Sequence, residues 1–209
     1  MSKHILDRAV WSALSTRQAY AAVGGDFARR FSPEIGPLAA ARDDNPQSLE
    51  ALAELIPIAG TLILLQADEI VLPPCVNIVM TALGVQMVAK KLEPMPNGLN
   101  SRIEKLTERD VPAMVALATL TKPGPFEAGT SRLGDFWGIR ENGMLLAMAG
   151  ERMKQAEYVE VSAVCTHPSA RGKGYARALS AAVARSDYRP RRNTLPSRLH
   201  DEYGSDPAL

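Results

Sequence analysis

Residues 159–176 read Val-Glu-Val-Ser-Ala-Val-Cys-Thr-His-Pro-Ser-Ala-Arg-Gly-Lys-Gly-Tyr-Ala, and they contain the strongest structural signal in the chain. Its apolar first half predicts a strand that stops at the turn breaker His167-Pro168. Gly172 and Gly174 then lead into an alanine-rich stretch that we expect to be helical. A strand that enters a helix through glycines leaves the first N–H groups of the helix unpaired, and an anionic phosphate satisfies them. The segment therefore predicts a diphosphate cradle.

Other phosphate motifs do not fit these residues. A P-loop needs Gly, four residues and then Gly-Lys-Ser/Thr, but Lys173 is followed by Gly174 and position 167 is not glycine. The three-glycine dinucleotide pattern is absent as well. What remains is the shorter form basic-Gly-x-Gly-x-Ala, in which Arg171 and Lys173 add positive charge beside the helix dipole. The alternative interpretation of such a hexapeptide is a solvated basic turn.

Residues 161–179 resemble the acetyl-CoA motif of the GNAT N-acetyltransferases, which reads Arg/Gln-x-x-Gly-x-Gly/Ala after a strand ending near Thr-His-Pro. Arg171 begins that motif here and Ala176 ends it. Residues 148–152 (Met-Ala-Gly-Glu-Arg) and 121–126 (Thr-Lys-Pro-Gly-Pro-Phe) resemble further blocks of a bacterial subfamily, in the same order. The resemblance is strong over about 100–185 and weaker before it.

The resemblance implies an α/β fold, the GNAT acyl-CoA N-acyltransferase fold, in which helices flank a mixed sheet. It implies acetyl-CoA as co-substrate, with its pantetheine arm along the strand before the motif. That assigns backbone contacts to Val164, Cys165 and Thr166. The alternative for Val164 and Cys165 is a buried strand. The diphosphate is assigned to Arg171, Gly172, Lys173, Gly174, Tyr175 and Ala176.

The chemistry that the resemblance implies is direct acyl transfer, in which a neutral amine attacks the thioester carbonyl. A backbone N–H of the strand stabilises the oxygen as it gains charge. Glu160 is our candidate for the base that takes the ammonium proton, directly or through water, if burial raises its pKa. A solvent-facing Glu160 is the alternative. A Cys165–His167 nucleophile pair is a competing hypothesis, although Pro168 bends the chain there.

Composition and charge bear on the partners, the redox compartment and the membrane association to expect. The chain has 209 residues, 46% of them hydrophobic, and a net charge of +1, so neither nucleic acid nor a membrane is expected as the main partner. Two cysteines far apart, Cys75 and Cys165, favour a reducing compartment without disulfides or a metal site. The longest apolar run, 56–65, is broken by Pro57 and Gly60. We therefore expect a cytoplasmic protein without a signal peptide or membrane span.

We expect an α+β block over residues 1–98. Its predicted elements are helices over 7–22 and 46–55 and strands over 61–66 and 86–89. Residues 93–98, Glu-Pro-Met-Pro-Asn-Gly, are the predicted linker. Nothing in this block forms a catalytic constellation, and a regulatory module remains an alternative for it.

We expect the acetyltransferase core over residues 99–185. A strand over 102–106 leads into a helix over 111–120, which Asp110 can cap and in which Pro112 fits the first turn. Three strands follow, and Glu141-Asn-Gly143 predicts a hairpin turn between the first two. The strands are predicted over 136–140, 144–152 and 157–166, and the motif helix over 176–185.

The tail over 186–209 departs from the family and is predicted to be disordered, because it lacks apolar periodicity and contains several prolines and arginines. Family members continue instead with a strand, a helix and closing strands, so the core is expected to be incomplete. Read one base later, suitable codons from Arg185 onward encode a peptide that resembles this continuation, including a Thr-Pro-Phe-Leu-His-Ala strand. We therefore hypothesise a reading-frame shift near residue 185.

Two functional hypotheses follow. The first is an acetyl-CoA-dependent N-acetyltransferase that acts on a small-molecule or peptide amine. The second is a catalytically crippled remnant that at most binds CoA or another protein. An exposed edge strand left by a truncated core makes a homodimer conceivable. The sequence does not identify the acceptor amine.

Overall fold

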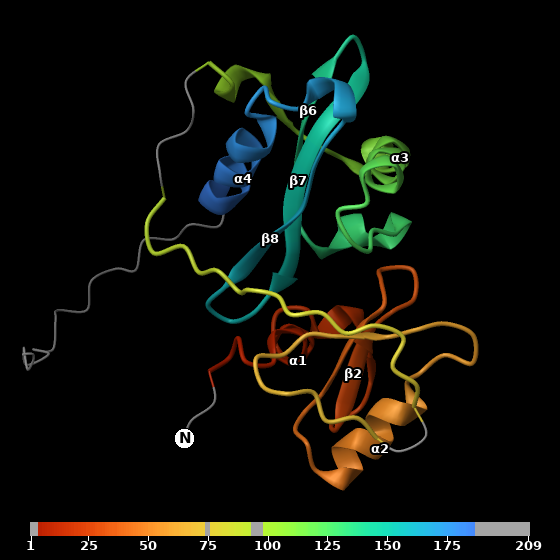
Figure 1. Ribbon diagram of the computed structural model, residues 1–209. Coiled ribbons are helices and arrows are strands. Elements are labelled where there is room, and N and C mark those ends of the chain that lie inside the picture. Colours follow the sequence, from red (N-terminus) through yellow and green to blue (C-terminus); the bar gives the residue numbers. More distant parts are fainter. Residues whose placement is uncertain (1–3, 74–75, 93–97, 187–209) are drawn as a thin grey trace, which may run out of the picture.

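The N-terminal half of the chain forms a four-stranded sheet with a helix on each face (Figure 1). The computed structural model describes residues 4–73, 76–92 and 98–186. Neighbouring strands are antiparallel except for the last pair, which is parallel. In order across the sheet the strands are β1 (Ala22–Gly24), β2 (Ala28–Phe31), β3 (Leu38–Ala41) and β4 (Ile63–Leu64). The helices are α1 (Ala9–Ser15) and α2 (Pro46–Glu54).

The second half forms a separate antiparallel sheet, which also has a helix on each face (Figure 1). Its strand order is β5 (Ile103–Lys105), β6 (Phe136–Glu141), β7 (Met144–Lys154) and β8 (Val159–Thr166). Helix α3 (Val111–Thr121) packs on one face and α4 (Tyr175–Ser186) on the other. Short 3₁₀ turns connect the elements: η1 (Ala19–Ala21), η2 (Asn100–Arg102), η3 (Glu108–Asp110), η4 (Ala128–Leu133) and η5 (Pro168–Ala170).

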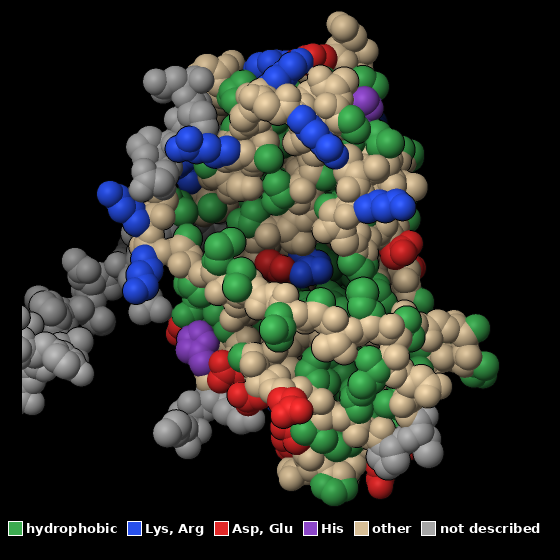
Figure 2. Space-filling model, in the orientation of Figure 1, with side chains coloured by type: hydrophobic (Ala, Val, Ile, Leu, Met, Phe, Trp, Pro, Cys, Tyr) green, Lys and Arg blue, Asp and Glu red, His purple; other side chains and the backbone are tan. Residues whose placement is uncertain are grey.

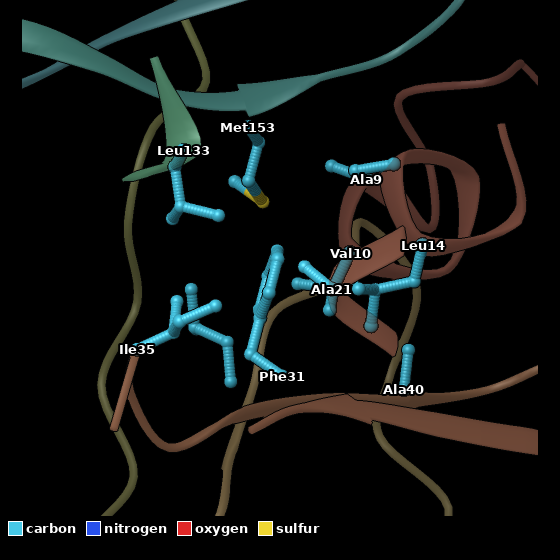
Figure 3. Packing of buried hydrophobic residues seen from close by; sticks show 11 residues of the cluster. Ala9, Val10, Leu14, Ala21, Phe31, Ile35, Ala40, Leu133 and Met153 are labelled. Carbon is cyan, nitrogen blue, oxygen red and sulfur yellow. The ribbon is translucent and has the colours of Figure 1, made fainter. Parts of the chain in front are cut away.

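One hydrophobic cluster joins the two halves. Phe31 of β2 and Leu14 of α1 pack in the same cluster as Met153 of β7 and Leu133 of η4 (Figure 3). Burying such side chains is the main favourable term in association between blocks. The C-terminal end of the long strand β7 is therefore part of the core of the N-terminal half.

The buried Gln18 side chain adds polar contacts at this junction. Its Nε2 donates to the carbonyl oxygens of Leu133 at 3.2 Å and Arg152 at 2.7 Å, and its Oε1 accepts from Lys154 N–H at 3.0 Å. An amide is suited to this position because it both donates and accepts. Gln18 thereby fixes the turn between α1 and η1 against β7.

The predicted α/β fold is confirmed, and so are its main elements in the second half. The Asn-Gly hairpin between β6 and β7 forms as predicted, with positive φ at Asn142 (50°) and Gly143 (79°). The predicted cap of α3 is wrong: Asp110 accepts from the Thr107 N–H at 2.7 Å and pairs with Arg140, and it makes no side-chain cap bond to α3.

Predictions for the N-terminal half were less accurate. The helix expected over 7–22 ends at Ser15, because the chain turns at Thr16 (φ −129°, ψ −107°) and then enters β1. Residues 86–89 form no strand, and only Ile63–Leu64 of the 61–66 strand pairs. The predicted linker lies mostly outside the described residues, as does the tail beyond Ser186. The division into domains therefore remains a prediction.

Candidate active site

The predicted strand, glycine turn and helix form one continuous path at an end of the second sheet. Strand β8 ends at Thr166, η5 makes one turn, and Gly172 and Gly174 adopt φ of +80° and +77° before α4 begins. These left-handed conformations favour glycine, since a side chain there is strained. A Cβ at Gly172 would meet no heavy atom within 4 Å, so the space beside this glycine is open.

The N-terminus of α4 provides backbone donors beside that open space. The first backbone hydrogen bond into the helix runs from Ala178 N–H to Gly174 O at 3.1 Å. The N–H groups that precede Ala178 in the first turn therefore have no acceptor further back in the helix. Arg171 and Lys173 are exposed next to them. Backbone donors, a positive dipole end and two cations together favour an anion such as a diphosphate.

Tyr175 fixes the beginning of α4 to the rest of the fold. Its ring is buried, its hydroxyl donates to Glu141 Oε1 at 2.6 Å, and it accepts from Arg102 Nη1 at 2.7 Å. Arg102 also bonds Glu141 at 2.6 Å, and Lys173 Nζ lies 3.5 Å from the same carboxylate. The hydrogen bonds from Tyr175 and Arg102 lower the pKa of Glu141 to about 2. The hydroxyl of Tyr175 thus already has hydrogen-bond partners within the protein. The backbone N–H of Tyr175 is the group that remains available to bind a ligand.

Sequence reasoning missed this network. The sequence predicts only a hairpin turn at Glu141 and only the start of a strand at Arg102. Neither belongs to the motif, and they are 39 positions apart in the chain. No local pattern signals that both converge on the first residue of α4.

Strand β8 carries an irregularity where the pantetheine contacts were predicted. Cys165 pairs with Met148 and Ser162 with Gly150, so two residues of β8 lie opposite one residue of β7. Ala163 has φ +51°, which marks this β-bulge. Within the described residues, β8 pairs with β7 alone. The backbone groups on the other edge of β8 therefore have no strand partner there.

The three predicted strand contacts have different surroundings. The Val164 side chain packs with the cluster under α4, and Cys165 is buried in the cluster under α3. The hydroxyl of Thr166 is buried and has no hydrogen-bond partner among the described residues. The side chains of Val164 and Cys165 therefore pack in the hydrophobic core. Only their backbone groups remain available to contact a ligand.

A cysteine nucleophile is not supported. Burial is the main cause that raises the pKa of the Cys165 thiol, which opposes thiolate formation. His167 Nδ1 instead lies 2.7 Å from Ser169 Oγ and accepts from the Ser169 N–H at 3.2 Å. The two side chains therefore do not act as a pair.

Glu160 is ion-paired with a residue of the neighbouring strand. Arg152 donates from Nε to Glu160 Oε2 at 2.9 Å and from Nη2 to Glu160 Oε1 at 2.6 Å. The two side chains are 18% and 30% exposed, so the pair is partly buried. Glu160 is therefore paired with Arg152 while its side chain stays partly exposed. In the sequence, Arg152 is part of the block over residues 148–152, and no local pattern predicts that it pairs with Glu160.

The described residues contain no cluster of three or more His, Cys, Asp or Glu side chains placed to hold a metal ion. No helix among them has the length and apolar character needed to cross a membrane.

Comparison with known proteins agrees with this geometry. Residues 136–194 match the family model described as FR47-like protein. A putative acetyltransferase from the GNAT family of Novosphingobium aromaticivorans DSM 12444 is 35% identical, with a TM-score of 0.74. The alignment covers 88% of this chain and 81% of that protein. No curated protein matches the chain.

Two other solved structures are more distant. Rv2747 from Mycobacterium tuberculosis, in complex with CoA and NLQ, is 16% identical over 40% of this chain and 55% of its own, with a TM-score of 0.36. A GCN5-related N-acetyltransferase from Kribbella flavida is 19% identical over 46% and 38%, with a TM-score of 0.35. These two similarities are too weak to support a conclusion about the fold or function of this chain. The relationship to the Novosphingobium protein, at its identity and coverage, shows that this chain belongs to the GNAT family of acetyltransferases.

Proposed function

We propose that this chain is an acetyl-CoA-dependent N-acetyltransferase that transfers an acetyl group to an amine. The observation that carries the proposal is the path from β8 through the left-handed Gly172 and Gly174 to the donor end of α4. Membership of the GNAT family supports the same chemistry.

The residues present fit acetyl-CoA. Open space beside Gly172 and the unpaired N–H groups of α4 suit its diphosphate, with Arg171 and Lys173 as neighbouring cations. The unpaired edge of β8 suits the amides of its pantetheine arm, which run parallel to a strand in extended form. Bound there, acetyl-CoA supplies a thioester whose carbonyl carbon is open to attack by an amine.

Glu160 is the proposed base. The incoming amine is an ammonium ion near neutral pH and must lose one proton before its nitrogen can attack. Glu160 accepts that proton, and the second proton lost on forming the amide goes to the departing thiolate or to water. A backbone N–H of β8 near the bulge at Ala163 stabilises the carbonyl oxygen as it gains charge. Arg152 must leave Glu160 for the ammonium to approach.

A Glu160→Gln variant tests the assignment. We expect it to bind acetyl-CoA as the parent does and to lose turnover by roughly 100-fold, because general-base catalysis contributes about 10²–10⁴ in rate. Glu157→Gln, an exposed glutamate in the turn before β8, is the matched control. Unchanged turnover in Glu160→Gln would exclude Glu160 as the base. Binding of acetyl-CoA without turnover of any amine by the parent chain would favour the CoA-binding remnant.

A further inference from the structure

An apolar stretch of the N-terminal half lies entirely on the surface. Residues 77–91 are all exposed. Seven of them are large hydrophobic residues at least 49% exposed: Ile78, Val79, Met80, Leu83, Val85, Met87 and Val88. Single apolar residues are common on protein surfaces, but a continuous exposed patch of this kind marks an interaction site. No other described part of the chain covers this stretch.

The stretch is extended. Residues 76–89 contain no helix, strand, turn or bend, and in Figure 1 they follow an open path along the outside of the N-terminal half toward the second half. Figure 2 shows hydrophobic side chains along the same path. Among the described residues, no backbone hydrogen bond begins or ends within 76–92. Successive side chains of an extended chain point to opposite sides, so every second residue shares a face.

One of these faces is directed at solvent although it is mostly apolar. Its residues, which we call the outward row, are Val79, Thr81, Leu83, Val85 and Met87. Leu83 at the centre of the row is 103% exposed. Gln86 lies on the opposite side, toward the body of the protein, where its Nε2 donates to Leu6 O at 3.5 Å. A strand on the surface of a monomer normally has the reverse arrangement, with apolar residues inward and polar residues outward.

The size and charge of the patch are those of a protein interface. Seven side chains of this kind present roughly 400–800 Å² of apolar surface. One partner in a standard protein interface contributes about 800 Å². Lys90 and Lys91 are the only charged residues within 77–91, and both stand at its end. The centre of the patch thus lacks charge, as the core of an interface does.

A second copy of this chain provides a matching surface. Two identical rows related by a twofold axis run in opposite directions and present the same residues to each other. An axis at Leu83 places this residue against its own copy and Val79 against Met87 of the partner subunit. The lysines of the two copies then lie at opposite ends of the contact, which avoids repulsion between like charges.

Other occupants fit the outward row less well. The tail over 187–209 contains few large aliphatic residues, namely Leu195, Leu199 and Leu209, so it cannot supply an apolar row. A lipid surface is unfavourable as well, because an extended chain with unpaired N–H and C=O groups is costly in hydrocarbon. In a dimer formed through side chains, the backbone edges stay in water.

We propose that residues 77–91 form a homodimer interface, in which the outward row packs against the same row of a second copy about a twofold axis at Leu83. This contact is independent of the proposed function, and it lies on a different element from the exposed edge of β8. It gives the N-terminal block a role in assembly.

Sedimentation equilibrium of the full chain tests the interface, with Leu83→Asp as the main variant. The parent chain should be a dimer. In Leu83→Asp two carboxylates meet at the axis, so we expect the dimer dissociation constant to rise by roughly 100-fold or more. Because Leu83 is fully exposed, the change leaves the fold of one chain intact. Leu120→Asp, at a 54% exposed leucine of α3, is the matched control and should leave the dimer unchanged.

A charge exchange tests the position of the axis. Leu83→Lys should also be a monomer by itself, because two ammonium groups then meet. An equimolar mixture of Leu83→Asp and Leu83→Lys should form a dimer that contains one copy of each, since opposite charges now face each other. A mixture that stays monomeric would overturn the contact at Leu83.

Three further results would contradict the interface. A parent chain that is monomeric at every concentration would exclude the dimer, and sedimentation of that monomer with phosphatidylcholine vesicles would assign the outward row to a lipid surface. A dimer that survives Leu83→Asp unchanged would have to form elsewhere, as at the edge of β8. Larger assemblies that grow with concentration would indicate contacts that do not close on a twofold axis.

Discussion

Gly172 adopts φ +80°, a backbone conformation that favours glycine. The space beside it is open, so a ligand can reach the backbone at this position. The sequence predicted this glycine, its partner Gly174 and the neighbouring cations, because short-range spacing fixes a turn into a helix. The bulge at Ala163 was not predicted, since alanine has no special preference for positive φ. Such a position is decided by the pairing of β8 with β7.

Gly172→Ala separates conformational strain from ligand contact. We expect it to lower the free energy of unfolding by about 1–2 kcal/mol, because alanine at positive φ is strained. We also expect roughly tenfold weaker acetyl-CoA binding by calorimetry, since the new methyl group extends toward the phosphate. Gly124→Ala is the control: it too has positive φ (+128°) and open space, in a loop after α3. Equal affinity of the two variants would contradict the cradle.

Glu141 makes stability depend on pH in a defined direction. Its pKa falls from the ordinary value of 4.5 to about 2, so its stabilising effect is complete above about pH 5 and is lost as the pH falls toward 2. The difference in melting temperature between the parent and Glu141→Gln should therefore be largest near neutrality and shrink below pH 4.5. Glu54→Gln, on the exposed end of α2, controls for the loss of one charge. A difference that grows on acidification would refute this role.

At the scale of elements, the second half was predictable because each strand and helix has its own signal. Strands β6 to β8 are long, and the Asn-Gly turn sets the register of the first pair. Strands β2 and β3 were missed. Their sequences, Ala-Arg-Arg-Phe and Leu-Ala-Ala-Ala, lack alternation because helices cover both faces of the sheet.

A substitution at Gly150 of β7 tests how tightly β7 packs against β6. A Cβ at this glycine would overlap the ring of Phe136, its partner on β6. We expect Gly150→Ala to lower the free energy of unfolding by about 1–3 kcal/mol in urea denaturation, because overpacking displaces a buried ring. Adding Phe136→Leu should recover part of that loss. Additive losses in the double variant would show that the two residues are not coupled.

At the scale of the whole molecule, the two halves share contacts that no local pattern predicts. Gln18 bonds residues 115 and 134 positions further along the chain, and Met153 enters the core of the N-terminal half. The sequence predicted two blocks with a boundary near residue 98 but gave no sign that β7 belongs to both. The ion pair of Arg152 with Glu160 depends on the same junction.

Gln18→Leu tests whether the junction stabilises the molecule. The change leaves two carbonyl groups and one N–H without their partner in a buried setting, which costs about 1–3 kcal/mol for each group left unsatisfied. We expect a large loss of stability in urea denaturation. Gln47→Leu, on the exposed side of α2, should change it little. Similar effects of the two substitutions would show that the junction contributes nothing.

In the proposed function, the turn between β8 and α4 binds the diphosphate of acetyl-CoA. The most direct measurement compares calorimetric binding of acetyl-CoA and acetylpantetheine, which lacks the diphosphate, to the 209-residue chain. We predict saturable binding of acetyl-CoA and binding of acetylpantetheine that is weaker by roughly 100-fold, because charge-assisted bonds to the helix end are lost. Equal binding of the two compounds, or no binding of either, would contradict a diphosphate site at this turn.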